Sequence, residues 1–448
     1  MTRREDQLVL GAFLHPTGHH QSSWRHPSSP RGASLDLAHY IAMAQTAERG
    51  CFDLLFLADG TAVDPGSELA RRANHYVAIF EPLTLLAALA TQTHHIGLVA
   101  TASTTYNQPL SVARAFASLD HLSGGRAGWN LVTSANPQEA LNFSRDEHLA
   151  HRDRYARARA FAEVVTGLWD CWDDDALVED RASGIYLDEA KVRQLNHVSE
   201  DFQVRGPLNM ARSPQGRPVI VQAGSSEAGR DLAAATADLM FTAQPSFDAA
   251  KLFYADVKER LAGYRRAAGD LRILPGISTI VAASRAEAED RRDALQALTH
   301  PALAIGQLSS MLGFDLAGHD PDGPLPPLPP TDASQHFRML IERLAQDGLS
   351  ILAIARQTGA ARSHGVVAGT ASDVADHIEQ WFTGRACDGF NIMPPLLPSG
   401  LDEFVDHVIP ELQRRGLFRD AYEATTLRGN LGLSRPGGPS ASRDRDSA

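Results

Sequence analysis

The 448-residue chain contains few cysteines and no long apolar run. Its three cysteines, Cys51, Cys171 and Cys387, lie far apart in the sequence, which argues against the disulfide framework that stabilises small secreted domains. The first apolar run, LVLGAFL, is too short for a secretory signal, and no small-residue cleavage site follows it. No stretch approaches the length of a membrane span. We therefore expect a reduced, cytoplasmic protein that does not associate with membranes.

Lysine is almost absent, and the balance of charge is acidic. Of the 42 basic residues only Lys191, Lys251 and Lys258 are lysines, and the formal net charge is −12. No lysine- or arginine-rich block stands out, which argues against binding to nucleic acid or to an anionic membrane surface. The chain also lacks a G-x-S-x-G elbow and a P-loop, so the sequence indicates neither esterase-type hydrolysis nor P-loop nucleotide chemistry.

What the chain does contain is a regular alternation of strand-like and helix-like segments. Short apolar runs, typical of strands buried on both faces, are mostly followed by amphipathic helices. Eight such runs lie at 8–14, 53–59, 96–104, 127–134, 218–223, 239–243, 273–282 and 389–393. This count predicts an α/β fold, a (β/α)8 TIM barrel with insertions. A doubly wound open sheet is the competing prediction, but no G-x-G-x-x-G follows the first strand.

We expect a single barrel domain over residues 1–433 with two insertions. The first, at about 173–214, breaks the alternation and contains segments that could pair as hairpin strands. The second, at about 299–331, is irregular and includes the proline-rich run PDGPLPPLPP. A lid over the active site, an oligomer contact and a plain loop are all consistent with this second insertion. The Gly/Pro/Ser/Arg-rich tail at 434–448 is predicted to be disordered.

Polar side chains follow the predicted strands at the ends that face the active site of a barrel. Asp59 ends the second strand, Ser103 and Thr104 end the third, and Ser134 ends the fourth. The carboxyl group of Asp59 could act as a general base, or it could hold a loop through hydrogen bonds. Few acid–base residues converge here, so a cofactor would carry the difficult chemistry if the protein is an enzyme.

The segment GSSEAGRD, from Gly224 to Asp231, places two serines at the start of a helix, directly after a predicted strand. The free N–H groups at a helix N-terminus bind phosphate well, and the hydroxyls of Ser225 and Ser226 could add hydrogen bonds. The alternative is that Ser225 only caps the helix. His151 and Tyr155 are four residues apart and share a helix face, so either could reach a phosphate or simply lie at the surface.

The loop after the first strand is rich in histidine, with His15, His19, His20 and His26 close together. A metal site is one interpretation, but the spacing is not H-E-x-x-H and no clear carboxylate partner accompanies the cluster. We expect no metal. A loop that contacts substrate and a polar loop without a role are the remaining alternatives.

Taken together, several strings resemble one known family. They include GHHQSSWRHP, FLADG, EPLTLLAALATQT, STTYNQPLSVARAFASLDHLSGGRAGWNLVTS, HRDRYARARAFAEVVTGLWDCW, VIVQAGSSEAGRDLAA and DGFNIMPPLLPSGLDEFVDHVIPELQRRGLFR. These strings resemble the nitrilotriacetate monooxygenase and dibenzothiophene-sulfone monooxygenase group of the bacterial luciferase superfamily. The resemblance extends from about residue 7 to residue 433.

The resemblance implies a TIM barrel that binds reduced FMN supplied by a separate NAD(P)H-dependent flavin reductase. In such enzymes reduced FMN and O2 form a C4a-(hydro)peroxide, which oxygenates a small sulfone, amine, polycarboxylate or ketone. The flavin contacts implied by the matching motifs are Asp59, Ser103 and Thr104, with Asn130 and Ser134 beside the ring system and His151, Tyr155, Ser225 and Ser226 at the ribityl and phosphate end. His20 and Asn130 are the catalytic candidates, His20 from its position in the first loop. A homodimer or homotetramer is a family expectation.

Two other functions remain open from the sequence. One is a deazaflavin-dependent oxidoreductase of the same superfamily, which would transfer hydride without oxygen. The other is a non-catalytic flavin-binding protein that stores or senses the cofactor. The GHH loop and the GRAGWNLVTS string resemble the monooxygenase branch more closely, and all the segments expected of an enzyme of this superfamily are present.

Overall fold

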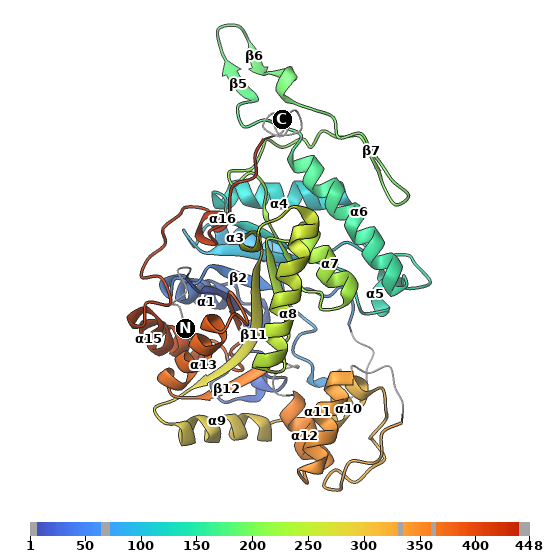
Figure 1. The fold of residues 1–448 in the computed structure, drawn as a ribbon, viewed down its shortest axis with the longest axis vertical. Helices are drawn as coiled ribbons and strands as arrows, with labels where there is room; N and C mark the ends of the chain where they lie inside the picture. Colours follow the sequence, from blue (N-terminus) through green and yellow to red (C-terminus); the bar gives the residue numbers. More distant parts are fainter. Residues whose placement is uncertain (1–6, 64–71, 330–334, 360–363, 439–448) are drawn as a thin grey trace.

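The computed structural model describes residues 7–63, 72–329, 335–359 and 364–438. Its centre is a closed barrel of eight parallel strands surrounded by helices (Figure 1). The barrel strands are β1 (Val9–Phe13), β2 (Leu54–Leu57), β3 (Gly97–Ser103), β4 (Ala127–Val132), β9 (Val219–Gln222), β10 (Leu239–Thr242), β11 (Arg272–Val281) and β13 (Gly389–Ile392). Closure is complete because β1 pairs with β13 and β10 pairs with β11. The predicted TIM barrel is confirmed, and the open-sheet alternative is wrong.

The strands are apolar because both of their faces are buried. Inward-facing Val9, Phe13 and Phe56 pack together inside the barrel. The C-terminal segment closes the opposite end from the mouth, where Leu427 of α16 (Leu427–Asn430) joins the same apolar cluster. A Cβ atom at Gly97 would lie 2.4 Å from the Leu427 side chain, so glycine at this strand start makes room for the plug.

Most barrel strands are followed by helices with recognisable N-terminal signals. Asp36 caps α1 through the N–H groups of Ala38 and His39, and Thr370 and Asp373 form a capping box on α13. The helices around the barrel are α1 (Leu37–Arg49), α3 (Pro82–Ala90), α4 (Pro109–Ser123), α6 (His151–Trp169), α7 (Glu227–Thr236), α8 (Phe247–Arg260), α9 (Arg285–Ala297), α13 (Ala371–Thr383), α14 (Ser399–Glu403) and α15 (Ile409–Arg414).

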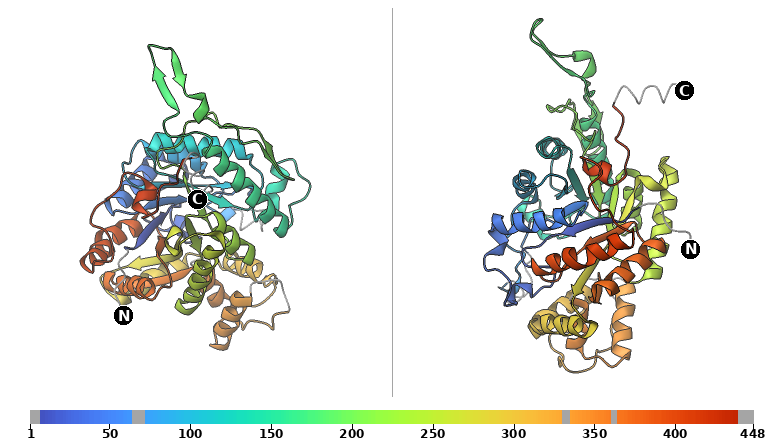
Figure 2. Two further views of the ribbon diagram at one scale, coloured as in Figure 1. Left: turned by 45° about the horizontal axis from the view of Figure 1, so that its top comes forward. Right: turned by 90° about the vertical axis from the view of Figure 1, so that its left-hand side faces the viewer.

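The first insertion projects from the barrel as an arm of hairpins (Figure 2). Within it β5 (Leu177–Asp180) pairs with β6 (Ile185–Leu187), and β7 (His197–Val198) pairs with β8 (Gln203–Val204), all antiparallel. Hairpin strands were predicted here. The start of the tail lies against this insertion, because Arg435 forms a 2.6 Å ion pair with Asp174. Residues 434–438 are therefore held in place, whereas 439–448 lie outside the described residues.

The second insertion is more regular than predicted. α10 (Pro301–Leu312) begins within it and packs with α11 (Gln335–Gln346) and α12 (Ile351–Gly359) around an apolar cluster of their own, apart from the barrel helices (Figure 1). Ala304, Leu308 and Leu312 recur every four residues and face this cluster. The prediction of an irregular stretch is thus wrong for 301–312. A further strand, β12 (Gly365–Gly369), pairs with the second half of β11 and was not predicted.

A buried ion pair stabilises the closed end of the barrel. Asp53, with no exposed surface, lies 2.7 Å from the guanidinium of Arg419. Its other oxygen accepts the N–H of Leu10 at 2.8 Å. Burial raises the pKa of Asp53 to about 6, although the Arg419 charge opposes this shift. The pair joins β2 to the C-terminal segment that plugs the barrel.

We expect Arg419→Ala to lower the free energy of unfolding by about 3–5 kcal/mol, because it leaves the Asp53 carboxyl group buried without its counter-charge. Urea unfolding followed by circular dichroism measures the loss. The control is Arg414→Ala, which removes an ion pair to Glu411 from an arginine whose side chain is 70% exposed and should change the midpoint far less. Equal effects of the two substitutions would contradict the role of the buried pair.

Candidate functional site

The carboxyl ends of β3 and β4 carry a cluster of hydroxyl groups joined to a carboxylate. Ser103 at the end of β3 lies 2.7 Å from Ser134, measured between the two Oγ atoms. Ser134 donates to Glu139 Oε2 at 2.6 Å, and Thr61 donates to the same oxygen at 3.0 Å. Glu139 belongs to the short helix α5 (Gln138–Asn142), which returns over the end of β4. The sequence predicted the two serines as site residues but not Glu139. The position of Glu139 just after the Asn-Pro turn that ends the strand was the feature that could have indicated it.

Asn130 lies inside the barrel and has one atom without a partner. Its Nδ2 donates to Thr101 Oγ1 at 2.8 Å across the β3–β4 pair, and Thr101 in turn donates to the carbonyl of Leu57. Asn130 is only 3% exposed, and its Oδ1 has no hydrogen-bond partner among the described residues. A buried acceptor of this kind is costly unless a ligand or water completes it. The atom therefore suits a ligand N–H group.

Two other predicted contacts differ in their surroundings. Thr104 is fully buried, and its Oγ1 donates to the carbonyl of Val132 at 3.2 Å, so the structure places this side chain away from the mouth. Asp59 is exposed at the mouth, although protein atoms around its carboxyl group desolvate it and raise its pKa. The negative charges of Glu81 and Glu139 add to that rise.

The predicted phosphate segment forms a tight cradle between β9 and α7. Ser226 caps α7 by accepting the N–H of Gly229 at 3.2 Å. Its hydroxyl hydrogen is not used in that bond, so capping and ligand binding are compatible. The Oγ of Ser225 lies 3.3 Å from Thr242 Oγ1 at the end of β10. A Cβ atom at Gly224 would lie 2.7 Å from the Tyr155 hydroxyl, so glycine permits the close approach of that tyrosine.

His151 and Tyr155 reach this cradle from the first turns of α6. Their ring centroids are 4.8 Å apart. The Tyr155 hydroxyl lies against Gly224, so the structure places Tyr155 at the start of α7, and His151 lies next to Tyr155 on α6. Hydroxyl groups, free helix N–H groups and an imidazole converge here, a combination that suits a phosphate group.

The histidine loop is buried at the mouth and holds His20 in one tautomer. His20 is 2% exposed, and its Nδ1 accepts the N–H of Ser22 at 3.2 Å. Burial and the neighbouring His75 lower the pKa of His20 to about 4. The ring is therefore neutral near pH 7 and carries its hydrogen on Nε2. Among the described residues, no group of three or more His, Cys, Asp or Glu side chains is arranged to hold a metal ion.

The second insertion begins against this loop. Ser22 and Thr299 approach to 3.1 Å between their hydroxyl oxygens, and the Arg25 guanidinium donates to the carbonyl of Leu298. The histidine loop is thus in contact with the segment that leads into α10.

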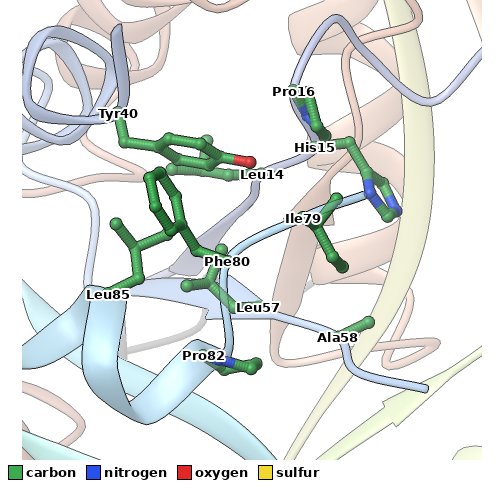
Figure 3. Close-up of a pocket in the computed structure, with 10 residues that line it drawn as sticks. All are labelled: Leu14, His15, Pro16, Tyr40, Leu57, Ala58, Ile79, Phe80, Pro82 and Leu85. Atoms are coloured by element: carbon green, nitrogen blue, oxygen red, sulfur yellow. The ribbon is translucent and has the colours of Figure 1, made fainter. Parts of the chain in front are cut away.

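An apolar pocket lies beside the loop, between the ends of β1 and β2 and the helices α1 and α3 (Figure 3). Tyr40 and Phe80 form one side, with ring centroids 5.9 Å apart, and His15 lies at another. Burial raises the pKa of Tyr40 to about 12, so its hydroxyl stays protonated. The remaining lining residues are Leu14, Pro16, Leu57, Ala58, Ile79, Pro82 and Leu85. The cavity volume is about 20 Å³, about enough for one water molecule.

The chain is also similar to known proteins. The family model described as luciferase-like monooxygenase matches residues 13–386. The chain is similar to N-acetyl-S-(2-succino)cysteine monooxygenase of Bacillus subtilis, with 47% identity over 97% of this chain and 99% of the relative. It is also similar to nitrilotriacetate monooxygenase component A of Aminobacter aminovorans, with 48% identity over 96% of this chain and 97% of the relative.

A solved structure of a riboflavin lyase, which contains modified FMN and riboflavin, superposes with a TM-score of 0.84. It is 31% identical and covers 98% of this chain and 99% of its own. Among the described residues, no helix has the length and apolar character needed to cross a membrane. The predicted family resemblance is confirmed by the family match and the two relatives. The chain belongs to the luciferase-like monooxygenase family.

Proposed function

We propose that this protein is the oxygenating component of a two-component monooxygenase that uses reduced FMN and O2. The observation that carries the proposal is the phosphate cradle, in which Tyr155 and Gly224 meet beside the serines that begin α7. The unpartnered Asn130 Oδ1 inside the barrel offers a second point of attachment, suited to a ring N–H. The modified FMN in the similar riboflavin lyase and the names of the two relatives support the same cofactor and reaction.

The proposed cofactor contacts follow from these positions. Ser225, Ser226, His151 and Tyr155 would hold the phosphate and ribityl end, and Asp59, Ser103, Ser134 and Asn130 would line the ring. Thr104 would act through the backbone of β4, because its side chain is buried against the carbonyl of Val132. When bound, reduced FMN supplies the electrons that activate O2 for transfer of one oxygen atom to the substrate.

The chain's own residues would keep water from the reaction and orient the substrate. Phe13, Phe56 and Phe241 form an aromatic cluster with ring centroids 4.8 to 5.8 Å apart, which makes the barrel below the mouth apolar. His20 would donate its Nε2 hydrogen to the substrate or to the reacting oxygen. The Ser22 N–H bond to Nδ1 fixes the tautomer that this role requires.

The substrate would be a small organic molecule of the sulfone, amine, polycarboxylate or ketone class. A polycarboxylate is favoured because the buried His20 can donate its Nε2 hydrogen to a carboxylate oxygen. The names of the two relatives, which act on N-acetyl-S-(2-succino)cysteine and nitrilotriacetate, point to the same class.

A separate NAD(P)H-dependent flavin reductase would supply the reduced FMN, as the designation "component A" of one relative suggests. We further propose that the protein is cytoplasmic and forms a homodimer or homotetramer. Deazaflavin-dependent hydride transfer and flavin storage are less well supported, because both relatives are named monooxygenases.

Labelled oxygen tests the reaction class. We expect the protein, supplied with reduced FMN and ¹⁸O₂, to place one ¹⁸O atom into nitrilotriacetate or N-acetyl-S-(2-succino)cysteine products, detected by mass spectrometry. Omitting the protein is the control for free-flavin chemistry. Turnover with a reduced deazaflavin, together with no ¹⁸O incorporation from reduced FMN, would instead support the hydride-transfer alternative.

The phosphate cradle is tested through discrimination between FMN and riboflavin, which lacks the phosphate. Ser226→Ala should weaken binding of reduced FMN about tenfold in anaerobic titrations, because a charged group loses a hydrogen bond, and should leave reduced riboflavin almost unaffected. Ser246→Ala is the matched control, since Ser246 also caps a helix, α8, through the N–H of Ala249. A similar loss for FMN and riboflavin would contradict the proposed phosphate contact.

His20→Ala should leave the dissociation constant for reduced FMN unchanged while lowering the fraction of consumed O2 that appears in product, with a matching rise in hydrogen peroxide. An oxygen electrode and a peroxide assay measure the two quantities with a substrate found in the labelling experiment. His20→Gln retains a donor near the Nε2 position and should recover part of the coupling. Unchanged coupling in His20→Ala would remove His20 from the reaction.

A further inference from the structure

A directional chain of hydrogen bonds crosses the mouth and ends on Glu139. Ser103 and Ser134 are joined by a 2.7 Å contact, and Ser134 donates to Glu139 at 2.6 Å. Glu139 and Ser134 are 7% and 5% exposed, so water has little access to this end of the chain. The carboxylate is thus the fixed acceptor toward which the two serine hydroxyls point.

Counting hydrogens gives the direction of every bond in the chain. A serine hydroxyl has one hydrogen to donate, and that of Ser134 goes to Glu139. The short contact between the serines therefore uses the hydrogen of Ser103. Ser103 Oγ also accepts the N–H of Thr105 at 3.1 Å. Both serine hydroxyls thus donate their hydrogens within this hydrogen-bond network. Toward a ligand at the mouth, each hydroxyl presents only lone pairs.

The same count applies independently to Asn130. Thr101 donates its only hydroxyl hydrogen to the carbonyl of Leu57 at 2.8 Å, so toward Asn130 it must accept. The Nδ2 group of Asn130 consequently faces Thr101, which leaves Oδ1 as the atom without a partner. Thr101 and Ser103 are two residues apart on β3 and share one face of the sheet. Acceptors from Ser103, Ser134 and Asn130 Oδ1 are therefore offered on neighbouring strands, and neither serine has a hydroxyl hydrogen left to donate to a ligand.

We propose that Glu139 is a positioning residue that makes Ser103 and Ser134 hydrogen-bond acceptors and thereby gives the site its preference for reduced over oxidised FMN. This inference rests on the proposed function and extends it to the redox state of the cofactor. The reduced ring carries hydrogens on both N5 and N3, whereas the oxidised ring has a bare lone pair at N5. The acceptors of Ser103 and Ser134 would attract the N5–H group of reduced FMN and repel the N5 lone pair of oxidised FMN.

Replacement of Glu139 by glutamine should reverse the direction of the hydrogen bonds between residue 139 and the two serines. The amide of glutamine can donate to Ser134 Oγ, after which the Ser134 hydrogen is free to point toward Ser103 or toward the ligand. The Ser134 hydroxyl could then donate to the N5 lone pair of oxidised FMN. The size of the side chain is nearly unchanged, so the effect follows from hydrogen-bond polarity rather than from lost packing.

The experiment measures the dissociation constants of reduced and oxidised FMN, in anaerobic and aerobic titrations, for the wild-type protein, Glu139→Gln and Thr61→Val. We expect the wild-type protein to bind reduced FMN at least about tenfold more tightly and Glu139→Gln to lower this ratio about tenfold. The midpoint potential of bound FMN should fall by about 30 mV in Glu139→Gln, the equivalent of tenfold for a two-electron couple. Thr61→Val removes the other hydroxyl on Glu139 and should leave the ratio unchanged.

The possible outcomes separate the two proposals. If the wild-type protein binds neither form of FMN, the proposed function itself fails. If it binds both, and Glu139→Gln keeps the wild-type ratio and potential, the role of Glu139 is overturned while the proposed function stands. An equal change in Thr61→Val and Glu139→Gln would also overturn it, because the effect would then reflect loss of loop structure. Thermal unfolding of each variant identifies a general loss of folding.

Discussion

The parallel pairing of β3 with β4 is the constraint on which the site depends. Six residue pairs in register, from Leu98 opposite Ala127 to Ser103 opposite Val132, fix the two strands relative to each other. This register places Thr101 beside Asn130 and brings the ends of both strands to the same height, so that Ser103 meets Ser134. A slip of one residue would turn every one of these side chains to the opposite face of the sheet. Barrel closure makes such a slip costly, because each strand is held by two neighbours.

The two ends of the barrel contain different kinds of buried polar group. At the closed end Asp53 is paired with Arg419, and Asp388 with Lys258 at 2.9 Å. At the mouth, Asn130 keeps a buried acceptor without a partner among the described residues. The two ion pairs join the strand starts to neighbouring elements, whereas the Asn130 acceptor lies toward the end at which a barrel enzyme binds its ligand.

The strands could be predicted because burial on both faces leaves an apolar run that stands out from its surroundings. The wrong or missing predictions depend on three-dimensional geometry, which the amino-acid sequence does not show directly. Ser103 and Thr104 are adjacent at a strand end, so their side chains point to opposite faces, and only Ser103 faces the mouth. Glu139 was missed because its contact with Ser134 depends on how the chain turns back after β4. α10 was not predicted, because the proline-rich run that follows it made the whole insertion look irregular.

The proposed cofactor site has opposite hydrogen-bonding polarity at its two ends. The cradle at the start of α7 offers donors, from the helix N–H groups and the hydroxyls of Ser225 and Tyr155, and these suit an anion. The ends of β3 and β4 offer acceptors, because Glu139 and the carbonyl of Leu57 take up the available hydroxyl hydrogens. A ligand with a phosphate at one end and ring N–H groups at the other would thus bind in a single orientation. These groups belong to strands and helix ends, whereas the histidine loop contacts the start of the second insertion.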